Sequence, residues 1–124
     1  VFTEPREWRE ARAECERMGG QLAKVSSASD NSELLALLRS NTWIGLNDEF
    51  YEGEWRWATS NDRLSPYANW APGQPGRLSH RKRGDYEHCV YVIKGFGSGG
   101  LWHDAPCRTR LAYACQNLVA PHPP

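Results

Sequence analysis

The stretch that decides the fold lies near the carboxyl end of the chain and reads Trp102-His103-Asp104-Ala105-Pro106-Cys107. It combines a large aromatic side chain, a candidate metal ligand and a cysteine in one short run. Two further cysteines flank it, Cys89 on the amino side and Cys115 on the carboxyl side. We therefore interpret the upstream chain as a scaffold that brings further oxygen ligands to this run.

Length and charge limit the classes of protein to which the chain can belong. Its 124 residues suit one domain, which we place at 1–118, with 119–124 as a proline-rich tail or linker. The count of lysine plus arginine equals that of aspartate plus glutamate, at 15 each. A nucleic-acid-binding protein usually has a basic excess, so we expect no nucleic-acid partner. We also expect no membrane span, because no apolar run reaches about 18 residues.

The four cysteines indicate an extracellular domain. They lie at positions 15, 89, 107 and 115 and form no C-x-x-C pair, which disfavours a zinc ribbon or a thioredoxin-type site. An even number at wide spacing is typical of two disulfides in a secreted protein. Four cysteines allow three pairings between which the sequence does not choose. We prefer the nested pairing, Cys15 with Cys115 and Cys89 with Cys107.

A first helix is expected near the amino end. Pro5 suits its first turn and Gly19-Gly20 its end. Apolar side chains at spacings of three and four predict its buried face, which consists of Trp8, Ala11, Cys15 and Met18.

A second helix is expected to begin near Ser29-Asp30 and to end near Asn41. Asp30 and Glu33 resemble a capping box at its start. Its wide apolar face consists of Leu34, Leu35, Leu37 and Leu38.

The remaining chain alternates between short strands and loops. The residue pattern predicts strands at 21–25, 42–46, 54–57, 88–93, 101–102 and 111–115. The region 61–84 is rich in proline, glycine, serine and asparagine and has little periodicity, so we expect a long loop, which is typical of a functional segment. Helices followed by several short strands predict an α+β fold with an antiparallel sheet.

Several motifs follow one another along nearly the whole chain. They are Trp8-Arg9-Glu10-Ala11, Gly19-Gly20-Gln21-Leu22-Ala23, Trp43-Ile44-Gly45-Leu46-Asn47-Asp48, Glu52-Gly53-Glu54-Trp55-Arg56-Trp57, Asn69-Trp70-Ala71-Pro72-Gly73-Gln74-Pro75, Glu87-His88-Cys89-Val90, Trp102-His103-Asp104-Ala105-Pro106-Cys107 and Tyr113-Ala114-Cys115. In this order they resemble one known family, the C-type lectin domain. The resemblance implies the nested disulfides, two helices, two small antiparallel sheets and a long loop with the ligand site. It also implies that the leading strand of the family is truncated before Val1.

The resemblance further implies a loop calcium ion that helps to bind a sugar. The retained ligands are Gln74, Glu87 and Asp104, whereas Gly76 and His103 stand where the family has further oxygen ligands. Three ligands with two charges predict weak calcium binding, in about the millimolar range of extracellular modules. Asp85 is a candidate to replace a lost carboxylate.

An auxiliary calcium site of the family would use Asp48 and Glu52. His88 and Arg77 stand where the family has further carboxylates, which weakens this prediction. The alternative interpretation is a solvated acidic loop formed by Asp48, Glu49, Glu52 and Glu54.

The sugar itself is predicted from the same positions. Gln74-Pro75 is similar to the galactose-type members of the family, and the predicted sugar contacts are Gln74, Glu87, His103, Asp104 and His80. His80 or Tyr86 stands in for the aromatic residue that usually follows the triplet in galactose binders.

A basic loop carries a second recognition hypothesis. It contains Arg77, Arg81, Lys82 and Arg83, whose charges suit a sulfated glycan or an acidic protein. The alternative interpretation is a solvated loop without a partner.

Other function classes fit less well. A transition-metal site at His88 and His103 with Glu87 and Asp104 matches no standard zinc spacing. Catalysis is not expected, because the chain has no Gly-x-Ser-x-Gly, His-Glu-x-x-His or phosphate-loop motif. Two hypotheses remain: a calcium-dependent glycan or glycoprotein binder, which the retained ligands slightly favour, and a calcium-independent protein-binding module on the same fold.

Overall fold

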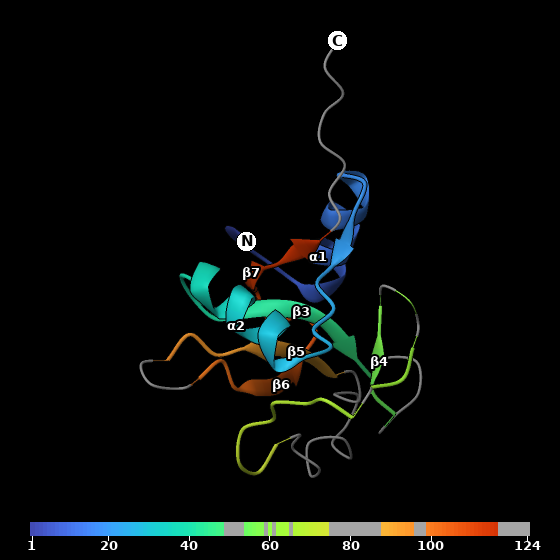
Figure 1. Cartoon of the computed structure of the whole chain (residues 1–124). Coiled ribbons are helices and arrows are strands. Elements are labelled where there is room, and N and C mark those ends of the chain that lie inside the picture. Colours follow the sequence, from blue (N-terminus) through green and yellow to red (C-terminus); the bar gives the residue numbers. More distant parts are fainter. Residues whose placement is uncertain are drawn as a thin grey trace.

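A computed structural model describes residues 1–48, 54–58, 60, 62–64, 66–74, 88–95 and 99–116. In this part the chain forms two helices and eight strands (Figure 1). The helices are α1 (Trp8–Arg17) and α2 (Ala28–Leu37), and the strands are β1 (Phe2–Arg6), β2 (Gln21–Leu22), β3 (Thr42–Asn47), β4 (Arg56–Trp57), β5 (His88–Val92), β6 (Trp102–Pro106), β7 (Leu111–Tyr113) and β8 (Cys115–Gln116).

The strands form two sheets, as the resemblance implied, one large and one small. The large sheet has six strands in the order β1-β7-β3-β5-β6, with β4 paired to β3, and the small sheet pairs β2 with β8. Among the named strands of the described part, the expected antiparallel arrangement holds for every pairing except β3 with β7, which is parallel. A parallel pair needs a long connection, and the chain between β3 and β7 supplies one.

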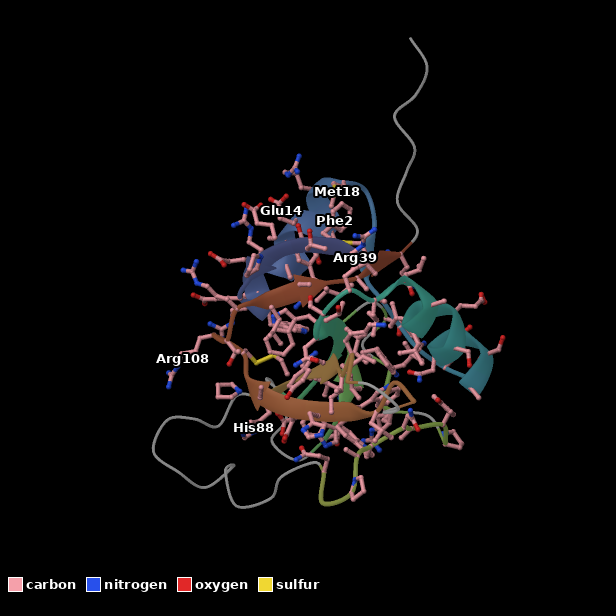
Figure 2. All side chains as sticks on the ribbon, turned by 90° about the vertical axis from the view of Figure 1, so that its left-hand side faces the viewer. Phe2, Glu14, Met18, Arg39, His88 and Arg108 are labelled. Atoms are coloured by element: carbon pink, nitrogen blue, oxygen red, sulfur yellow. A yellow bond between two sulfur atoms is a disulfide. The ribbon has the colours of Figure 1, made fainter. Side chains whose placement is uncertain are left out.

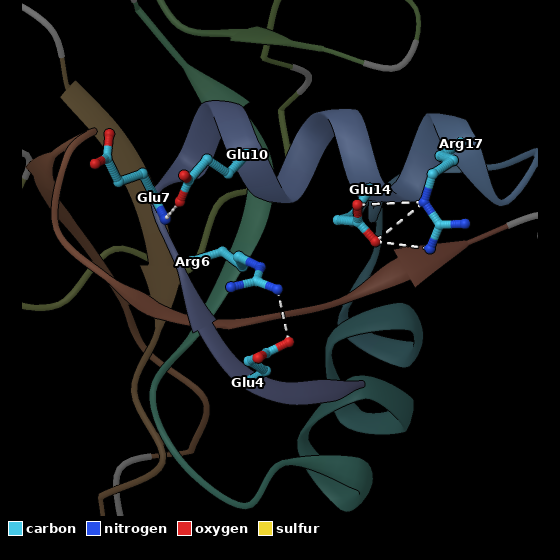
Figure 3. A network of polar contacts seen from close by, with 6 residues as sticks. All are labelled: Glu4, Arg6, Glu7, Glu10, Glu14 and Arg17. Atoms are coloured by element: carbon cyan, nitrogen blue, oxygen red, sulfur yellow. Dashed lines mark hydrogen bonds and ion pairs between the residues drawn. The ribbon is translucent and has the colours of Figure 1, made fainter.

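The amino end corrects two predictions. A leading strand is present, because β1 pairs with β7 through Phe2–Tyr113 and Arg6–Leu111. Pro5 lies in this strand and not in a helical turn, and β1 is at the edge of the sheet, where proline is tolerated. Helix α1 therefore begins at Trp8, and the backbone N–H of Glu7 donates to the Glu10 carboxylate over 3.0 Å (Figure 3).

The end of α1 confirms the predicted stop at the two glycines. Gly19 has a φ of 85°, which favours glycine. Its N–H donates to the carbonyl of Glu16, and the N–H of Gly20 donates to the carbonyl of Cys15. These two bonds form a Schellman motif, which satisfies carbonyls that the helix leaves without partners.

Helix α2 begins earlier than predicted. Its N-cap is Ser27, whose hydroxyl accepts from the N–H of Asp30 over 3.1 Å. The predicted Asp30–Glu33 capping box is thus wrong, since Asp30 is the third helical residue and accepts from the N–H of Ser26. The helix ends at Leu37, whose side chain is 62% exposed and lies outside the core.

Two clusters of buried apolar residues pack the helices against the sheet. One contains Trp8, Ala11, Cys15, Leu22, Trp43, Cys89, Cys107 and Tyr113. The other contains Ala23, Val25, Leu34, Leu38, Ile44, Leu46, Trp57, Val90, Val92, Trp102 and Ala114. Helix α1 contributes to the first cluster and α2 to the second, so residues that alternate along β3, β5 and β6 divide between them.

The disulfides confirm the nested pairing. Cys15 bonds to Cys115, with 100 residues of separation, and Cys89 bonds to Cys107 (yellow bonds in Figure 2). The first bond ties α1 to β8, and the second ties β5 to the turn after β6. In the described part of the chain, neither helix has the length and apolar character that a membrane span requires.

Candidate functional site

The candidate site lies where the segment 69–74 runs along the edge strand β6 (Figure 1, yellow-green segment below β6). The N–H of Trp102 donates to the carbonyl of Asn69 over 2.8 Å, and the N–H of Ala71 donates to the carbonyl of Trp102 over 3.0 Å. A turn follows, in which the N–H of Gln74 donates to the carbonyl of Ala71. The first two bonds attach the segment to Trp102, the first residue of β6.

The turn brings Gln74 next to Asp104. The N–H of Asp104 donates to Oε1 of Gln74 over 3.2 Å. An amide oxygen has two lone pairs, so this bond uses one and leaves a second for another partner. An amide oxygen and a carboxylate are the hard oxygen donors that calcium prefers. In chemical type these two residues therefore fit a calcium ion.

Aromatic side chains form the base of this site. The Trp102 ring lies 5.8 Å from Tyr67, 5.7 Å from Trp70 and 6.0 Å from Trp57, centroid to centroid, and all three contacts are edge-on. Trp55 packs on Trp70 at 5.2 Å. Trp70 and Trp102 therefore pack against each other next to the turn. The packing holds the backbone on both sides of the Gln74–Asp104 contact.

The structure places the His103 ring against Tyr91, on the face of β6 opposite to the Asp104 side chain. Successive side chains of a strand point to opposite faces of the sheet, and the His103 ring lies 5.7 Å from Tyr91, its partner across the β5–β6 ladder. Tyr91 in turn contacts Trp43, which belongs to the α1 cluster. Burial, and secondarily the negative charge of Asp104, raises the pKa of the Tyr91 phenol.

Asp48, predicted for the auxiliary calcium site, joins the ends of β3 and β5. Its N–H donates to the carbonyl of His88 over 3.1 Å, and its Oδ1 accepts from the N–H of His88 over 3.2 Å. Each of the two residues is only 2% exposed. The solvated-loop interpretation is therefore wrong for Asp48. The other described acid of that stretch, Glu54, accepts from the guanidinium of Arg56 over 2.6 Å.

Many predicted site residues lie outside the described part of the chain. They are Glu49, Glu52, Pro75, Gly76, Arg77, His80, Arg81, Lys82, Arg83, Asp85, Tyr86 and Glu87. Among the residues that the structure describes, no three histidine, cysteine, aspartate or glutamate side chains gather as a metal-binding group. Gln74 and Asp104 are thus the part of the predicted ligand set that the structure brings together.

Sequence reasoning missed two asparagines that hold this region. The Trp102 indole N–H donates to Oδ1 of Asn31 over 2.9 Å, and Nδ2 of Asn69 donates to the carbonyl of Gly100 over 2.8 Å. Asn31 has a weak signal in the sequence, because it is a polar residue one helical turn before the buried Leu34. Asn69 stands beside Trp70 in a motif that we interpreted without assigning it a role.

Comparisons with known proteins show similarity to one family over most of the chain. The family model of the lectin C-type domain matches residues 4–117. Hepatic lectin of Gallus gallus is 34% identical over 110 residues, which make up 88% of this chain and 49% of hepatic lectin. The versican core protein of Rattus norvegicus is 35% identical over 115 residues, or 93% of this chain and 4% of versican. The chain therefore spans about half of the first relative and a small part of the second.

A solved structure of a C-type carbohydrate-recognition domain is also similar to this chain. The C-type carbohydrate-recognition domain of cow CD23, determined in the presence of a GlcNAc2Man3 oligosaccharide, has a TM-score of 0.79 to this chain. The two are 30% identical, and the match covers 97% of this chain and 86% of that domain.

Proposed function

The chain belongs to the C-type lectin family, and from this premise we propose that it is an extracellular module that binds glycans without catalysis. The binding surface is the one formed by the 69–74 segment and β6. The contact between Gln74 Oε1 and Asp104 N, 3.2 Å apart, carries the proposal, because it brings the Gln74 amide to the backbone of the residue that carries the Asp104 carboxylate. The two disulfides favour the extracellular location, since such bonds persist in oxidising compartments.

Calcium is the cofactor that this site would use. Gln74 and Asp104 would hold it, with Glu87 as a third ligand from outside the described residues. When bound, calcium supplies a positive charge to which sugar hydroxyl oxygens are attracted. Asp104 accepts hydrogen bonds from sugar hydroxyls, and Gln74 both accepts through Oε1 and donates through Nε2. The small number of charged ligands places the expected affinity at about the millimolar level.

A galactose-type glycan or glycoprotein is the proposed ligand. Gln74-Pro75 supports this choice by its similarity to galactose-type members of the family. His80 remains a proposed sugar contact. His103 remains one too, although its ring lies against Tyr91, on the face opposite Asp104. The presence of an oligosaccharide in the CD23 structure supports glycan binding in general and no particular sugar for this chain.

A second candidate is calcium-independent binding of an acidic protein or a sulfated glycan. The position of His103 favours it, because a side chain that faces Tyr91 does not add a ligand beside Gln74. The partner would contact the basic residues Arg77, Arg81, Lys82 and Arg83, which lie outside the described part.

Thermal unfolding with excess calcium and then with a chelator tests the proposal. A ligand at a hundredfold excess over its dissociation constant stabilises the folded state by about 2.7 kcal/mol. We expect a higher melting temperature with calcium, and we expect Asp104→Asn to abolish the rise. The matched control is Asp62→Asn, which removes an exposed carboxylate that pairs with Lys24.

Retention on immobilised glycans separates the two candidates. Calcium-dependent retention on galactose-terminated glycans, lost in Asp104→Asn, supports the proposal. Equal retention with calcium and with chelator supports the second candidate, and no retention on any glycan contradicts glycan binding.

A further inference from the structure

We infer that Asn31, on helix α2, is a positioning residue for the site at Gln74 and Asp104. The inference rests on the proposed function, because it assigns to a residue outside the site the role of setting the site's geometry. Asn31 contacts neither Gln74 nor Asp104 in the hydrogen bonds of the described residues. It acts through Trp102, which lies two positions before Asp104 in the same strand.

Both the oxygen and the nitrogen of the Asn31 side-chain amide form hydrogen bonds. Oδ1 accepts from the Trp102 indole N–H over 2.9 Å, and Nδ2 donates to the carbonyl of Gly100 over 3.2 Å. The side chain is buried, with 4% of the residue exposed. Because oxygen and nitrogen have different partners, only one orientation of the amide satisfies both bonds. Asn31 therefore sets the position of the Trp102 ring relative to the backbone at Gly100.

The Gly100 carbonyl links α2 to the site segment. It accepts from Asn31 over 3.2 Å and also from Nδ2 of Asn69 over 2.8 Å. Asn69 donates to the carbonyl of Gly99 as well. The Gly100 carbonyl oxygen thus accepts one hydrogen bond from a side-chain amide of the helix and one from a side-chain amide of the segment that carries Gln74.

Trp102 connects the Asn31 side chain to the site through its backbone hydrogen bonds. Its backbone N–H and carbonyl bond to Asn69 and Ala71, which fixes the register of the segment on β6. Gln74 bonds back to Ala71, and Asp104 follows Trp102 on the same face of the strand. A shift of the indole therefore changes the alignment that places Gln74 Oε1 against Asp104 N.

Space filling alone does not account for Asn31. Leucine has a similar size and would fill the same volume among apolar neighbours. It would leave the buried indole N–H of Trp102 without its acceptor, and a buried donor without an acceptor is unfavourable. The ring or the strand would then move to find another partner.

The test compares Asn31→Leu with Leu34→Ala, a core variant on the same helix. Calcium alone is the probe, and its dissociation constant is measured by calorimetry well below the unfolding temperature of each variant. We expect Asn31→Leu to weaken calcium binding by about tenfold, as the loss of a buried hydrogen bond allows. Leu34→Ala should lower stability at least as much but leave the dissociation constant within about twofold. Equal effects of the two variants would overturn the inference.

A double variant adds a rescue that a purely structural role would not give. Trp102→Phe removes the indole N–H, so the pair Asn31→Leu/Trp102→Phe leaves neither partner of that bond unsatisfied. We expect the pair to bind calcium better than Asn31→Leu alone. Additive losses in the double variant would contradict action through Trp102.

Amide hydrogen exchange separates failure of the inference from failure of the proposed function. If the wild-type chain binds no calcium, the proposed function is wrong, but the exchange rate of the Asp104 amide still reports the bond to Gln74. For each variant, the exchange rates of the Asp104 and Ala71 amides are compared with the rate of exchange through global unfolding. We expect this ratio to be at least about tenfold higher in Asn31→Leu than in Leu34→Ala. Unchanged protection at both amides would overturn the positioning role whether or not calcium binds.

Discussion

Gln74 and Asp104 are 30 residues apart in the chain, yet the side-chain oxygen of one accepts the backbone N–H of the other over 3.2 Å. The bond couples the end of the loop segment to the middle of the edge strand. It also means that the segment is held on β6 by a residue that the proposed calcium site uses. Substitutions at Gln74 are therefore expected to change both the attachment of the segment and the affinity for calcium.

Gln74→Glu separates these two effects. A glutamate still offers an oxygen to the Asp104 N–H and adds a negative charge to the ligand set. Calcium affinity rises with ligand charge. We expect calcium to bind about tenfold more tightly than in the wild type, measured by calorimetry. Without calcium the variant should be less stable, because its new charge lies near the Asp104 carboxylate.

The matched control is Gln74→Leu, which removes the oxygen altogether. It should weaken calcium binding and expose the Asp104 amide to hydrogen exchange. If Gln74→Glu binds calcium no better than the wild type, Gln74 is not a ligand.

Gly100→Ala tests the crowding around Asn31. Gly100 has a φ of 70°, and a Cβ at this position would lie 2.7 Å from Nδ2 of Asn31. Gly99 has a φ of 68° but no atom within 4 Å of its Cβ position among the described residues. Gly99→Ala should thus cost only the strain of the left-handed backbone, about 1–2 kcal/mol. Gly100→Ala should lower the free energy of unfolding by about 1–3 kcal/mol more than Gly99→Ala does, because the clash also displaces Asn31.

Urea unfolding of both alanine variants measures this difference. Their shared backbone conformation cancels in the comparison, so the remainder reports the contact with Asn31. Equal losses of stability in the two variants would mean that the amide moves aside without cost.

Local chemistry explains which parts of the fold the sequence predicted. The end of α1 was predictable, because Gly19 and Gly20 form the stop with bonds to Cys15 and Glu16, all within one turn. Pro5 was misassigned for the opposite reason. Proline suits a first helical turn and an edge strand equally well, and the choice depends on pairing with β7, about 105 residues later.

In the candidate site, too, the sequence predicted the residues that stand in motifs but not those whose role depends on a distant partner. The retained ligands Gln74 and Asp104 were identifiable from motifs, and the structure brings them together. Asn31 was not identifiable, because its function depends on a partner 71 residues away in the chain. The position of His103 also required the β5–β6 register, which places its ring against Tyr91.

Tyr91 should make stability fall at alkaline pH. Burial raises the pKa of its phenol above the ordinary value of 10.0, and the charge of Asp104 adds to the effect. The folded state therefore keeps the phenol proton to higher pH than the unfolded state does. The resulting stability is fully present below about pH 10 and is lost as pH rises toward the folded-state pKa.

Urea unfolding at about pH 8 and about pH 11 should show a smaller alkaline loss in Tyr91→Phe than in the wild type. Tyr67 and Tyr113 also have raised pKa values, so part of the loss should persist. Asp104→Asn should lower the pKa of Tyr91, which a phenolate absorbance titration measures. An unchanged alkaline loss in Tyr91→Phe would show that this phenol titrates alike in both states.

His103 and Asp104 are adjacent in sequence but should differ sharply in function. Asp104 lies beside Gln74, whereas the His103 ring lies 5.7 Å from Tyr91 on the other face of the sheet. We expect Asp104→Ala to abolish calcium binding, and His103→Ala to change the calcium dissociation constant by less than about twofold. His103→Ala should instead lower stability modestly, by about 0.5–1 kcal/mol, through loss of the cross-strand contact with Tyr91. Calorimetry and urea unfolding of the two variants measure both quantities. A large loss of calcium affinity in His103→Ala would show that the strand turns in the bound state to bring this side chain to the ion.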